Sequence, residues 1–526
     1  MSVRSDLPDH SKTGQSRQGL IMIVAQVRKW FNQIGEPAFL VIASLSAFVV
    51  VIYFFCPAFV YWKGLELAIP DSFSKSEVNR AMATLQKIES PFQSIEYPPG
   101  QNTEITWRML FPLLGHYLHI PRLLFLALPH LGCLLVLGLV AYLVCRQTGD
   151  RWFALGTAIL MGTSSWFFVS TGWLAYFDSW YVLGLLVVGF VPTRSALIIA
   201  AVLTPWVDER FVIAIPIALL VRALDFKNLQ QWNPVRYRTE VLIVLGLIIP
   251  YLGFRLASTF YGVNHASVFS HLRIVEEQRL LRLAALADEH PAMVTIHVAH
   301  LPILSFVPLN LLESHWGGLR AVWLFCGCCV WFAWSAGRWK WGTITVLTIV
   351  GCELILMVLA PDFSRNVSTL LPVALLGVLV LGRLQPSGRK EWLYLALAFN
   401  LLTPASHGFN CWRQPIYNLY YEVESYKSPP DYLNPVKYNQ LAVQLVGQND
   451  WTNALVQLDY ALTLNPKHVE SLLSRAFVRK HLDDRAGAIQ DLTLALKTCP
   501  ADWPRRTIAQ TFLEQIRSVG KTSPAK

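Results

Sequence analysis

Charged residues are scarce in this chain. Only 15% of its 526 residues are Asp, Glu, Lys or Arg, whereas 54% are hydrophobic and 12% are aromatic. This composition argues against one soluble globule, because soluble domains carry about a quarter charged residues. The lipid bilayer is the expected solvent for most of the chain. Its 19 Trp and 18 Tyr agree with that, since both side chains favour the boundary between lipid and water.

Signatures of several functional classes are also missing. The nine cysteines show no metal-ligand spacing, and Cys326, Cys328 and Cys329 lie inside an apolar run, where we expect them to pack. There is no Gly-x-x-x-x-Gly-Lys-[Ser/Thr] loop for nucleotide phosphates and no His-Glu-x-x-His motif for zinc. The net charge of +10 comes from short loops rather than from a basic stripe with interleaved aromatics, so no nucleic-acid partner is expected.

Apolar runs predict an all-α membrane domain over residues 38–404. The first run, 38–62, is uncharged, long enough to cross a bilayer and without a small-residue cleavage site, so we expect an anchor rather than a removable signal peptide. Several later runs are shorter than the roughly 20 residues that a straight span needs. We predict about eleven spans in all, the later ones near 122–145, 152–171, 176–192, 195–207, 211–223, 240–258, 320–337, 341–360, 367–383 and 391–404.

The distribution of Lys and Arg predicts the orientation of these spans. Residues 1–37 are expected to be a cytoplasmic segment with an amphipathic helix at 19–33 lying on the membrane surface. With this end inside, the basic short loops all fall on the cytoplasmic side, as the positive-inside rule requires. The long loop 63–121 and the region from about 405 onward then lie outside. The apolar stretch 293–312 would reverse the side of the C-terminal region if it were a full span.

A self-similarity of 34 residues marks the segment 431–526, which follows a linker at 405–430. Ala442, Ala454, Ala461 and Pro466 recur as Ala476, Ala488, Ala495 and Pro500. The segment resembles the tetratricopeptide repeat (TPR), in which small residues let two antiparallel helices pack closely and proline closes the second helix. Arg475, Arg479 and Arg485 replace large residues in the second copy, which indicates a solvated or partner-facing surface. A groove for a protein or peptide partner and a merely stabilising appendage are equally open.

Charged residues at the ends of apolar runs are the candidates for a functional site, because ionisable groups near hydrocarbon are costly. In the predicted topology these residues share the outside face. Asp71 and Glu104, in the first outside loop, are the candidates for catalysis. The candidates for binding a substrate or phosphate are Arg108, Asp178, Asp208, Glu209, Arg210, Asp362 and Arg365.

The long outside loop with its acidic residues, an amphipathic helix within that loop, about eleven spans and an extracytoplasmic C-terminal domain resemble the GT-C class of membrane glycosyltransferases over residues 38–404. The resemblance implies a multi-pass enzyme of the cell (inner) membrane that takes a sugar from a polyprenyl-phosphate donor. It also implies a first-loop carboxylate as catalytic base or metal ligand, which Asp71 fits, and it leaves the need for a divalent cation open. The chain departs from the class at 61–66, where Tyr-Trp-Lys-Gly-Leu-Glu stands in place of a paired acidic motif.

The chemistry that this resemblance implies needs a base and a cation. Asp71 or Glu104 would take a proton from the acceptor hydroxyl, and Arg210 or Arg365 would stabilise the departing lipid phosphate. Two other functions stay open. A membrane-anchored scaffold could recruit a partner through the repeats, although one span would suffice to anchor it. A transporter is expected to show internal duplication, and the sequence shows none that is convincing.

Overall fold

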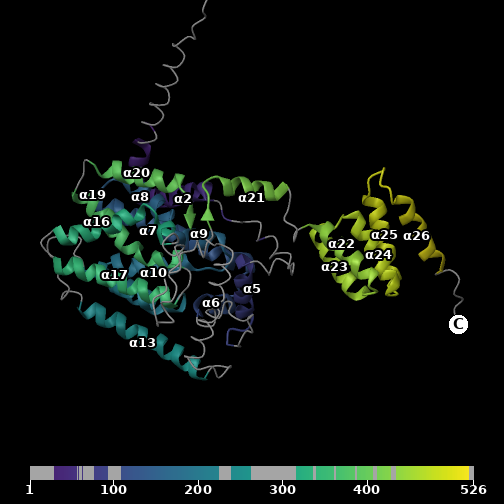
Figure 1. Ribbon diagram of the computed structural model, residues 1–526, viewed down its shortest axis with the longest axis horizontal. Coiled ribbons are helices and arrows are strands. Elements are labelled where there is room, and N and C mark those ends of the chain that lie inside the picture. Colours follow the sequence, from purple (N-terminus) through teal and green to yellow (C-terminus); the bar gives the residue numbers. More distant parts are fainter. Residues whose placement is uncertain are drawn as a thin grey trace, which may run out of the picture. The chain divides into compact units, whose positions relative to one another are not determined.

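The computed structural model of the chain is built almost entirely of helices (Figure 1). Its contacts divide the chain into two units, Met1–Pro57 with Ala83–Leu419 and Ala58–Met82 with Tyr420–Lys526. The predicted all-α class is confirmed. The strands among the described residues are only β1 (Ala405–Ser406) and β2 (Trp412–Arg413), which pair antiparallel. The structure describes residues 26, 29–55, 57, 62, 76–92, 108–223, 238–261, 315–335, 339–359, 363–384, 388–406, 412–427 and 434–519.

Every predicted apolar run in the first unit coincides with one or more helices. Helix α7 runs through the middle of this unit, and α13 lies at its edge (Figure 1). Two of the boundaries between the units fall within helices α5 (Ser76–Glu89) and α21 (Tyr417–Lys427). The other helices are α2 (Glu36–Phe54), α6 (Leu110–Tyr117), α7 (Arg122–Thr148), α8 (Arg151–Gly162), α9 (Ser165–Gly172), α10 (Asp178–Phe190), α11 (Arg194–Leu203), η2 (Thr204–Trp206), α12 (Arg210–Ala223), α13 (Arg238–Tyr261), α16 (Val322–Ser335), α17 (Trp339–Leu359), α18 (Phe363–Asn366), η4 (Val367–Leu370), α19 (Leu371–Leu384) and α20 (Arg389–Leu402).

Four stretches of helix are long and apolar enough to cross a membrane: Glu36–Phe54, Arg122–Thr148, Arg238–Ala257 and Ser364–Arg383. Helices α8 and α9 make a fifth if they are taken as one span bent by 65°. Several other apolar helices have only 10–17 residues, and α10 is one of them. Within the described residues, length and composition therefore support four or five spans, and the count of about eleven stays a prediction.

The first span is shorter than its apolar run. Helix α2 ends at Phe54, eight residues before the predicted end at residue 62. Pro57 follows closely, and a proline just beyond a helix cannot continue it because it lacks a backbone N–H. Of the predicted surface helix at 19–33, residues 29–33 are helical and most of the remainder lies outside the described residues, as does the whole of 293–312.

Turn chemistry joins α7 to α8. Gly149 ends α7 with a φ of 67°, which glycine adopts without the penalty that a Cβ atom brings. Asp150 then caps α8, and its Oδ1 accepts hydrogen bonds from the backbone N–H groups of Trp152 and Phe153, both at 3.1 Å. The same carboxylate pairs with Lys390 at 2.6 Å. The α7–α8 turn is thus joined to the start of α20.

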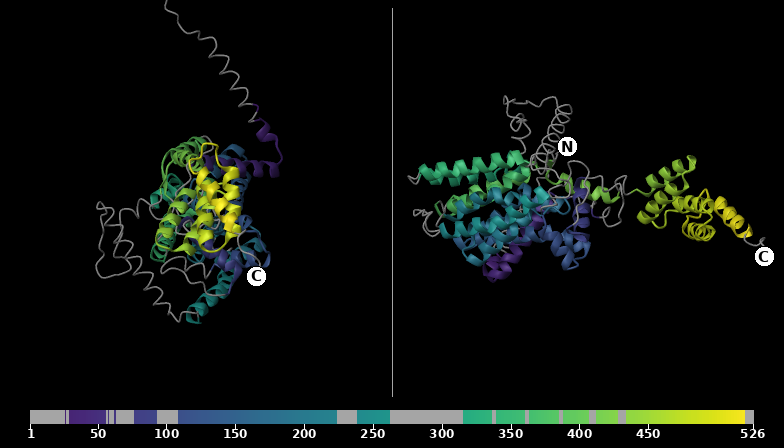
Figure 2. Two further views of the ribbon diagram at one scale, coloured as in Figure 1. Left: turned by 90° about the vertical axis from the view of Figure 1, so that its right-hand side faces the viewer. Right: turned by 90° about the horizontal axis from the view of Figure 1, so that it is seen from below.

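In the second unit the 34-residue self-similarity appears as two helical hairpins of equal size. Each helix of the first hairpin has its counterpart 34 residues later, and Asn449 and Asp483, also 34 residues apart, both turn with a φ of 61°. Both views of Figure 2 show these helices, yellow-green to yellow, packed side by side. The helices are α22 (Pro435–Gly447), α23 (Trp451–Leu464), α24 (Val469–His481), α25 (Arg485–Thr498) and α26 (Arg506–Val519).

The recurrent alanines account for the close packing of the hairpins. All six are fully buried, so a larger side chain at any of them would push two helices apart. Helix α26 follows α25, and its Leu513 and Ile516 are buried against the second hairpin, while Ile508 is exposed. The six alanines are Ala442, Ala454, Ala461, Ala476, Ala488 and Ala495.

Two of the three arginines in the second hairpin do not form the open surface that their sequence positions indicate. Arg475 donates two hydrogen bonds to the buried carboxylate of Asp491, at 2.9 and 2.7 Å, and one to Asp459 at 2.8 Å. Arg479 adds a bond to Asp491 at 3.0 Å. Both guanidiniums are therefore used inside the repeat, whereas Arg485 is exposed. The sequence did not show this because the partner carboxylate lies on the next helix.

Candidate functional site

Six of the predicted charged residues meet at one place in the first unit. They come from four separate segments of the chain: the residues just before α6, the start of α10, the turn from η2 into α12, and α18. We call this set the charge cluster. Its members are Arg108, Asp178, Asp208, Glu209, Arg210 and Arg365.

Asp178 lies at the centre of the charge cluster. It is the first residue of α10 and is 1% exposed. Arg365 binds its carboxylate in bidentate fashion, from Nε to Oδ1 at 3.1 Å and from Nη2 to Oδ2 at 2.8 Å. Arg210 donates to the same Oδ1 from Nη2 at 2.5 Å. A single buried carboxylate therefore holds the two arginines that the sequence nominated for binding phosphate.

Asp208 extends the cluster on the other side of Arg210. Arg210 donates to Asp208 from Nε at 2.9 Å and from Nη2 at 2.7 Å, and its backbone N–H donates to Oδ1 at 3.0 Å. Arg108 lies 3.3 Å from Asp208 and binds Glu209 in bidentate fashion, with both bonds at 2.9 Å. The charges thus alternate in sign along the cluster, from Glu209 through Arg108, Asp208, Arg210 and Asp178 to Arg365.

Aromatic side chains support the guanidinium groups of the cluster. The guanidinium carbon of Arg210 lies 5.0 Å from the ring centroid of Tyr181, and that of Arg365 lies 4.8 Å from the ring centroid of Tyr176. Such contacts stabilise a cation that has been removed from water. The sequence analysis did not nominate these tyrosines. Their signal was available, because they flank Asp178 in the segment Tyr176-Phe-Asp-Ser-Trp-Tyr181.

Neighbouring helices fix the segment that carries Asp178. The backbone N–H of Ser179 donates to the Ser170 hydroxyl at 2.8 Å, and the Ser179 hydroxyl donates to the Pro129 carbonyl at 2.7 Å. The Trp180 indole donates to the Leu128 carbonyl at 2.8 Å. Helices α7 and α9 therefore both hold the start of α10, and Asp178 is held in a set position.

The electrostatic balance of the cluster keeps Asp208 ionised. Burial by itself raises the pKa of the Asp208 carboxyl, but the guanidiniums of Arg108 and Arg210 outweigh burial and hold that pKa well below its ordinary value. Three arginines face two aspartates and one glutamate, so the cluster carries no formal net charge. An entering anion meets arginines that already have partners, and the attraction it feels is weaker than three unpaired cations would exert.

Arg210 still has hydrogen-bonding capacity although it is paired. A guanidinium carries five N–H donors. Arg210 uses those on Nε and Nη2, and its Nη1 donates to no group among the residues that the structure describes. Carboxylates that hold a guanidinium from one side orient it, in the way that outer partners orient metal ligands. The arrangement therefore provides oriented donors rather than a concentrated positive charge.

Three of the nominated residues, Asp71, Glu104 and Asp362, lie outside the described residues, so their positions relative to the charge cluster stay a prediction. Among the described residues no group of three or more His, Cys, Asp or Glu is arranged to hold a metal ion. Asp71, which the resemblance offers as a metal ligand, is not among those residues.

Among the described residues of the first unit, one buried acid was missed by the sequence analysis. Glu353, inside the apolar helix α17, is 6% exposed. It accepts a hydrogen bond of 2.5 Å from the Thr369 hydroxyl, and its Oε2 lies 3.5 Å from Nε2 of His315. A lone carboxylate in the apolar run 341–360 is the signal that could have identified it, because intramembrane ionisable groups tend to be functional.

Comparisons with protein-family models, with curated proteins and with solved structures gave no match to this chain. The interpretation of the charge cluster therefore rests on its geometry and on the sequence around it.

Proposed function

We propose that this protein is an integral membrane glycosyltransferase that transfers a sugar from a polyprenyl-phosphate donor at the extracytoplasmic face. The observation that carries the proposal is that six nominated charged residues from four segments of the chain meet in one cluster, whose central members are buried. Ion pairs inside an apolar unit are costly to desolvate, and apolar side chains of similar volume would serve packing as well. A purely structural role therefore explains poorly why six charged residues, rather than apolar ones, meet at this place.

In this proposal the cluster binds the donor phosphate and the first outside loop supplies the base. Asp178 and Asp208 orient Arg210, whose Nη1 donors stabilise the phosphate as it departs with its lipid, and Arg365 adds its positive charge. Asp71 or Glu104 accepts the proton of the acceptor hydroxyl as that oxygen attacks the anomeric carbon. The same proposal includes a membrane domain of about eleven spans and a charge cluster on the extracytoplasmic side of the membrane.

The base assignment predicts a large loss of activity in one of two variants. Asp71→Asn or Glu104→Gln is expected to lower sugar transfer about 100-fold or more, because a general base contributes about 10²–10⁴-fold. Transfer is measured in membranes with a radiolabelled polyprenyl-phosphate sugar. If both single variants kept full activity, neither residue would be the base.

The phosphate assignment is tested with Arg365→Lys, which keeps the charge but removes the bidentate geometry. We expect at least about tenfold slower transfer at equal protein level. Arg222→Lys is the matched control, because Arg222 is also a buried arginine paired with a carboxylate, Glu240 at 2.7 Å. Arg222 lies in the last turn of α12, whereas the cluster meets the first residue of that helix. Equal losses in the two variants would point to folding rather than to phosphate binding.

A membrane-anchored scaffold is the second candidate function, and the second unit favours it. We infer that α22–α26 form a TPR-type domain on the extracytoplasmic side, supported by the 34-residue offset of its helix bounds. Val443 on α22 and Phe477 on α24 occupy equivalent positions of the two copies, and they are 55% and 41% exposed. Exposed apolar side chains at equivalent positions of adjacent helices are suited to contact a peptide.

The scaffold function predicts a partner that depends on these two side chains. Full-length protein with Val443→Ser and Phe477→Ser is expected to lose a co-purifying extracytoplasmic partner that the wild type retains. Val456→Ser, at an exposed position on α23, is the control and should retain it. If the double variant kept its partner while Arg365→Lys lost sugar transfer, the enzyme would be supported and this surface would not.

A further inference from the structure

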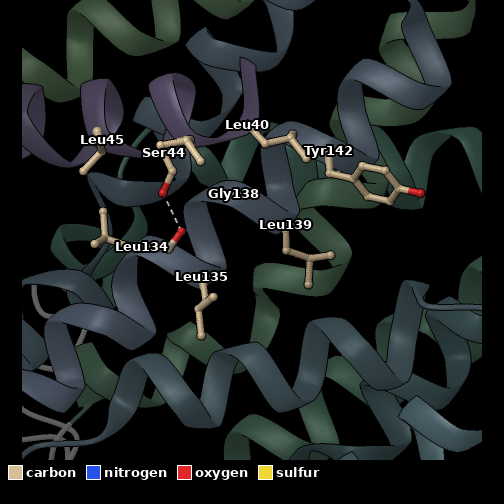
Figure 3. Close-up of a pocket in the computed structure, with 9 residues that line it drawn as sticks. Leu40, Ser44, Leu45, Leu134, Leu135, Gly138, Leu139 and Tyr142 are labelled. Carbon is tan, nitrogen blue, oxygen red and sulfur yellow. Dashed lines mark hydrogen bonds between the residues drawn. The ribbon is translucent and has the colours of Figure 1, made fainter. Parts of the chain in front are cut away.

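An apolar groove runs between α2 and α7 in the first unit, away from the charge cluster. Its volume is about 470 Å³, within the range of about 300–1,000 Å³ that is typical of small-molecule sites. Both helices belong to the stretches that are long and apolar enough to cross a membrane. We call it the α2/α7 groove. It is lined by Leu40, Val41, Ser44, Leu45, Leu134, Leu135, Gly138, Leu139 and Tyr142 (Figure 3).

The walls of the α2/α7 groove suit a hydrocarbon chain and not water. Val41, Leu45 and Leu135 are 58%, 48% and 44% exposed, so the groove is open toward the surroundings of the two helices. The Ser44 hydroxyl donates to the Leu134 carbonyl at 2.6 Å, which Figure 3 shows as a dashed line. A water needs two to four polar partners, and this hydroxyl is already bonded.

A glycine opens the middle of the groove. Gly138 on α7 faces Ser44 on α2, and a Cβ atom at Gly138 would lie 3.7 Å from the Ser44 Cβ atom. That distance is an ordinary contact, so the helices do not need a glycine here in order to pack. The absent side chain leaves space between two leucine-rich walls.

One end of the groove is polar and basic. Tyr142 lies there beside Leu40, opposite the end with Leu45 and Leu134 (Figure 3). The Tyr142 hydroxyl accepts a hydrogen bond from Nη1 of Arg146 at 2.7 Å. Arg146 is exposed, and no carboxylate pairs with it among the residues that the structure describes.

Other charges near this end leave it positive. Arg151 donates to the carbonyls of Phe31 and Ile34, both at 2.8 Å. These two bonds hold the residues just before α2 beside the turn that follows α7. Lys29 and Trp30, just before that segment, are both exposed. Of the acids that the structure describes close to Cys145 in the last turns of α7, Asp150 is paired with Lys390 and Glu36 is exposed. Lys29 and Arg146 therefore outnumber Glu36, and exposed aromatic and basic residues favour the headgroup region.

We propose that the α2/α7 groove binds one acyl chain of an anionic glycerophospholipid, whose phosphate contacts Arg146 and the Tyr142 hydroxyl. The groove follows α7 from Leu134 to Tyr142, which is about 12 Å of helix at 1.5 Å per residue. That length is somewhat under half of the roughly 30 Å hydrocarbon thickness of a bilayer, so it suits a chain from a single leaflet. Basic pockets between membrane helices are known to bind anionic headgroups. This site does not depend on the proposed sugar transfer.

The test counts lipids bound to the purified full-length protein by native mass spectrometry. The protein is titrated with phosphatidylglycerol and, separately, with phosphatidylcholine that has the same acyl chains. We expect the wild type to bind one phosphatidylglycerol at least about tenfold more tightly than phosphatidylcholine. Equal affinities would overturn the anionic headgroup. Formation of a dimer in place of lipid binding would assign the groove to a second copy of the chain.

Two variants separate the chain site from the headgroup site. Gly138→Leu fills the groove and should abolish binding of both lipids, whereas Gly246→Leu, in α13 with open space around its Cβ position, should bind as the wild type does. Arg146→Gln should weaken phosphatidylglycerol binding much more than phosphatidylcholine binding, whose choline already offsets the phosphate charge, and so remove the preference for phosphatidylglycerol. Its control is Arg238→Gln, at an exposed arginine that begins α13.

Each variant is checked for folding by its thermal unfolding midpoint. A folded Gly138→Leu protein that still bound phosphatidylglycerol as the wild type does would overturn the chain site. A folded Arg146→Gln protein that kept the preference would overturn the headgroup contact.

Discussion

Replacing Arg210 with leucine is expected to lower the free energy of unfolding of the first unit by about 3–5 kcal/mol, because breaking a buried ion pair leaves an uncompensated buried charge. Arg210 is 4% exposed and joins Asp178 to Asp208, which are 1% and 2% exposed. Arg365 beside Asp178 and Arg108 beside Asp208 remain in place after the substitution. The two central carboxylates then face each other across a leucine side chain that cannot donate a hydrogen bond.

The measurement is the unfolding of the detergent-solubilised protein by heat or denaturant. Arg194→Leu is the matched control, because Arg194 lies 3.9 Å from Glu240 in a pair whose arginine is 72% exposed. An exposed pair contributes about 0–1 kcal/mol, so this variant should unfold nearly as the wild type does. Adding Asp208→Asn to Arg210→Leu should restore part of the loss, since it removes one uncompensated charge. Equal stability of Arg210→Leu and the wild type would contradict the ion-pair account.

Adding a single methyl group at Gly377 is expected to cause the second large loss of stability. Gly377 lies on α19, and a Cβ atom there would come 1.8 Å from the backbone carbonyl oxygen of Phe325 on α16. A backbone atom cannot rotate away as a side chain can, so the two helices would have to separate. Small residues allow this kind of close approach between membrane helices. We expect Gly377→Ala to lower the free energy of unfolding by about 3 kcal/mol, at the upper end of the usual cost of overpacking.

Gly327→Ala is the control for this prediction. Gly327 lies on α16, two residues after Phe325, and has open space around its Cβ position. Alanine in a helix interior is favoured over glycine by about 0.5–1 kcal/mol, so this variant should be equally or more stable. Both variants are measured by thermal unfolding in the same detergent. A Gly377→Ala protein as stable as Gly327→Ala would mean that α16 and α19 do not approach as closely as the structure shows.

Much of the fold could be predicted because apolar length and periodicity are local properties. The runs at 122–145 and 240–258 became α7 and α13 with ends shifted by a few residues. The apolar run at 38–62 extends past the end of α2 at Phe54, because hydropathy does not show that a proline such as Pro57 cannot continue a helix. Composition also could not reveal the 65° bend between α8 and α9 inside one apolar run, because a bend depends on what packs against it.

The candidate site could be predicted only in part. Asp178, Arg210 and Arg365 were nominated because each lies at the end of an apolar run, and a shared topology places such ends on one face. Their mutual pairing could not be deduced, since it depends on how four separate segments pack. Glu353 lies alone in the middle of an apolar run, so the criterion of charge at a run end does not select it.

The sequence by itself determined that most of this chain is helical and apolar, and that its last part repeats every 34 residues. Both follow from which residues occur at which spacing, and spacing along a helix translates directly into a face. Only the tertiary structure decided that the nominated arginines are paired with buried aspartates, that Arg475 and Arg479 bind Asp491, and that α2 and α7 leave an open groove. These features depend on contacts between distant segments, and the energy of such a contact is a property of the two partners together.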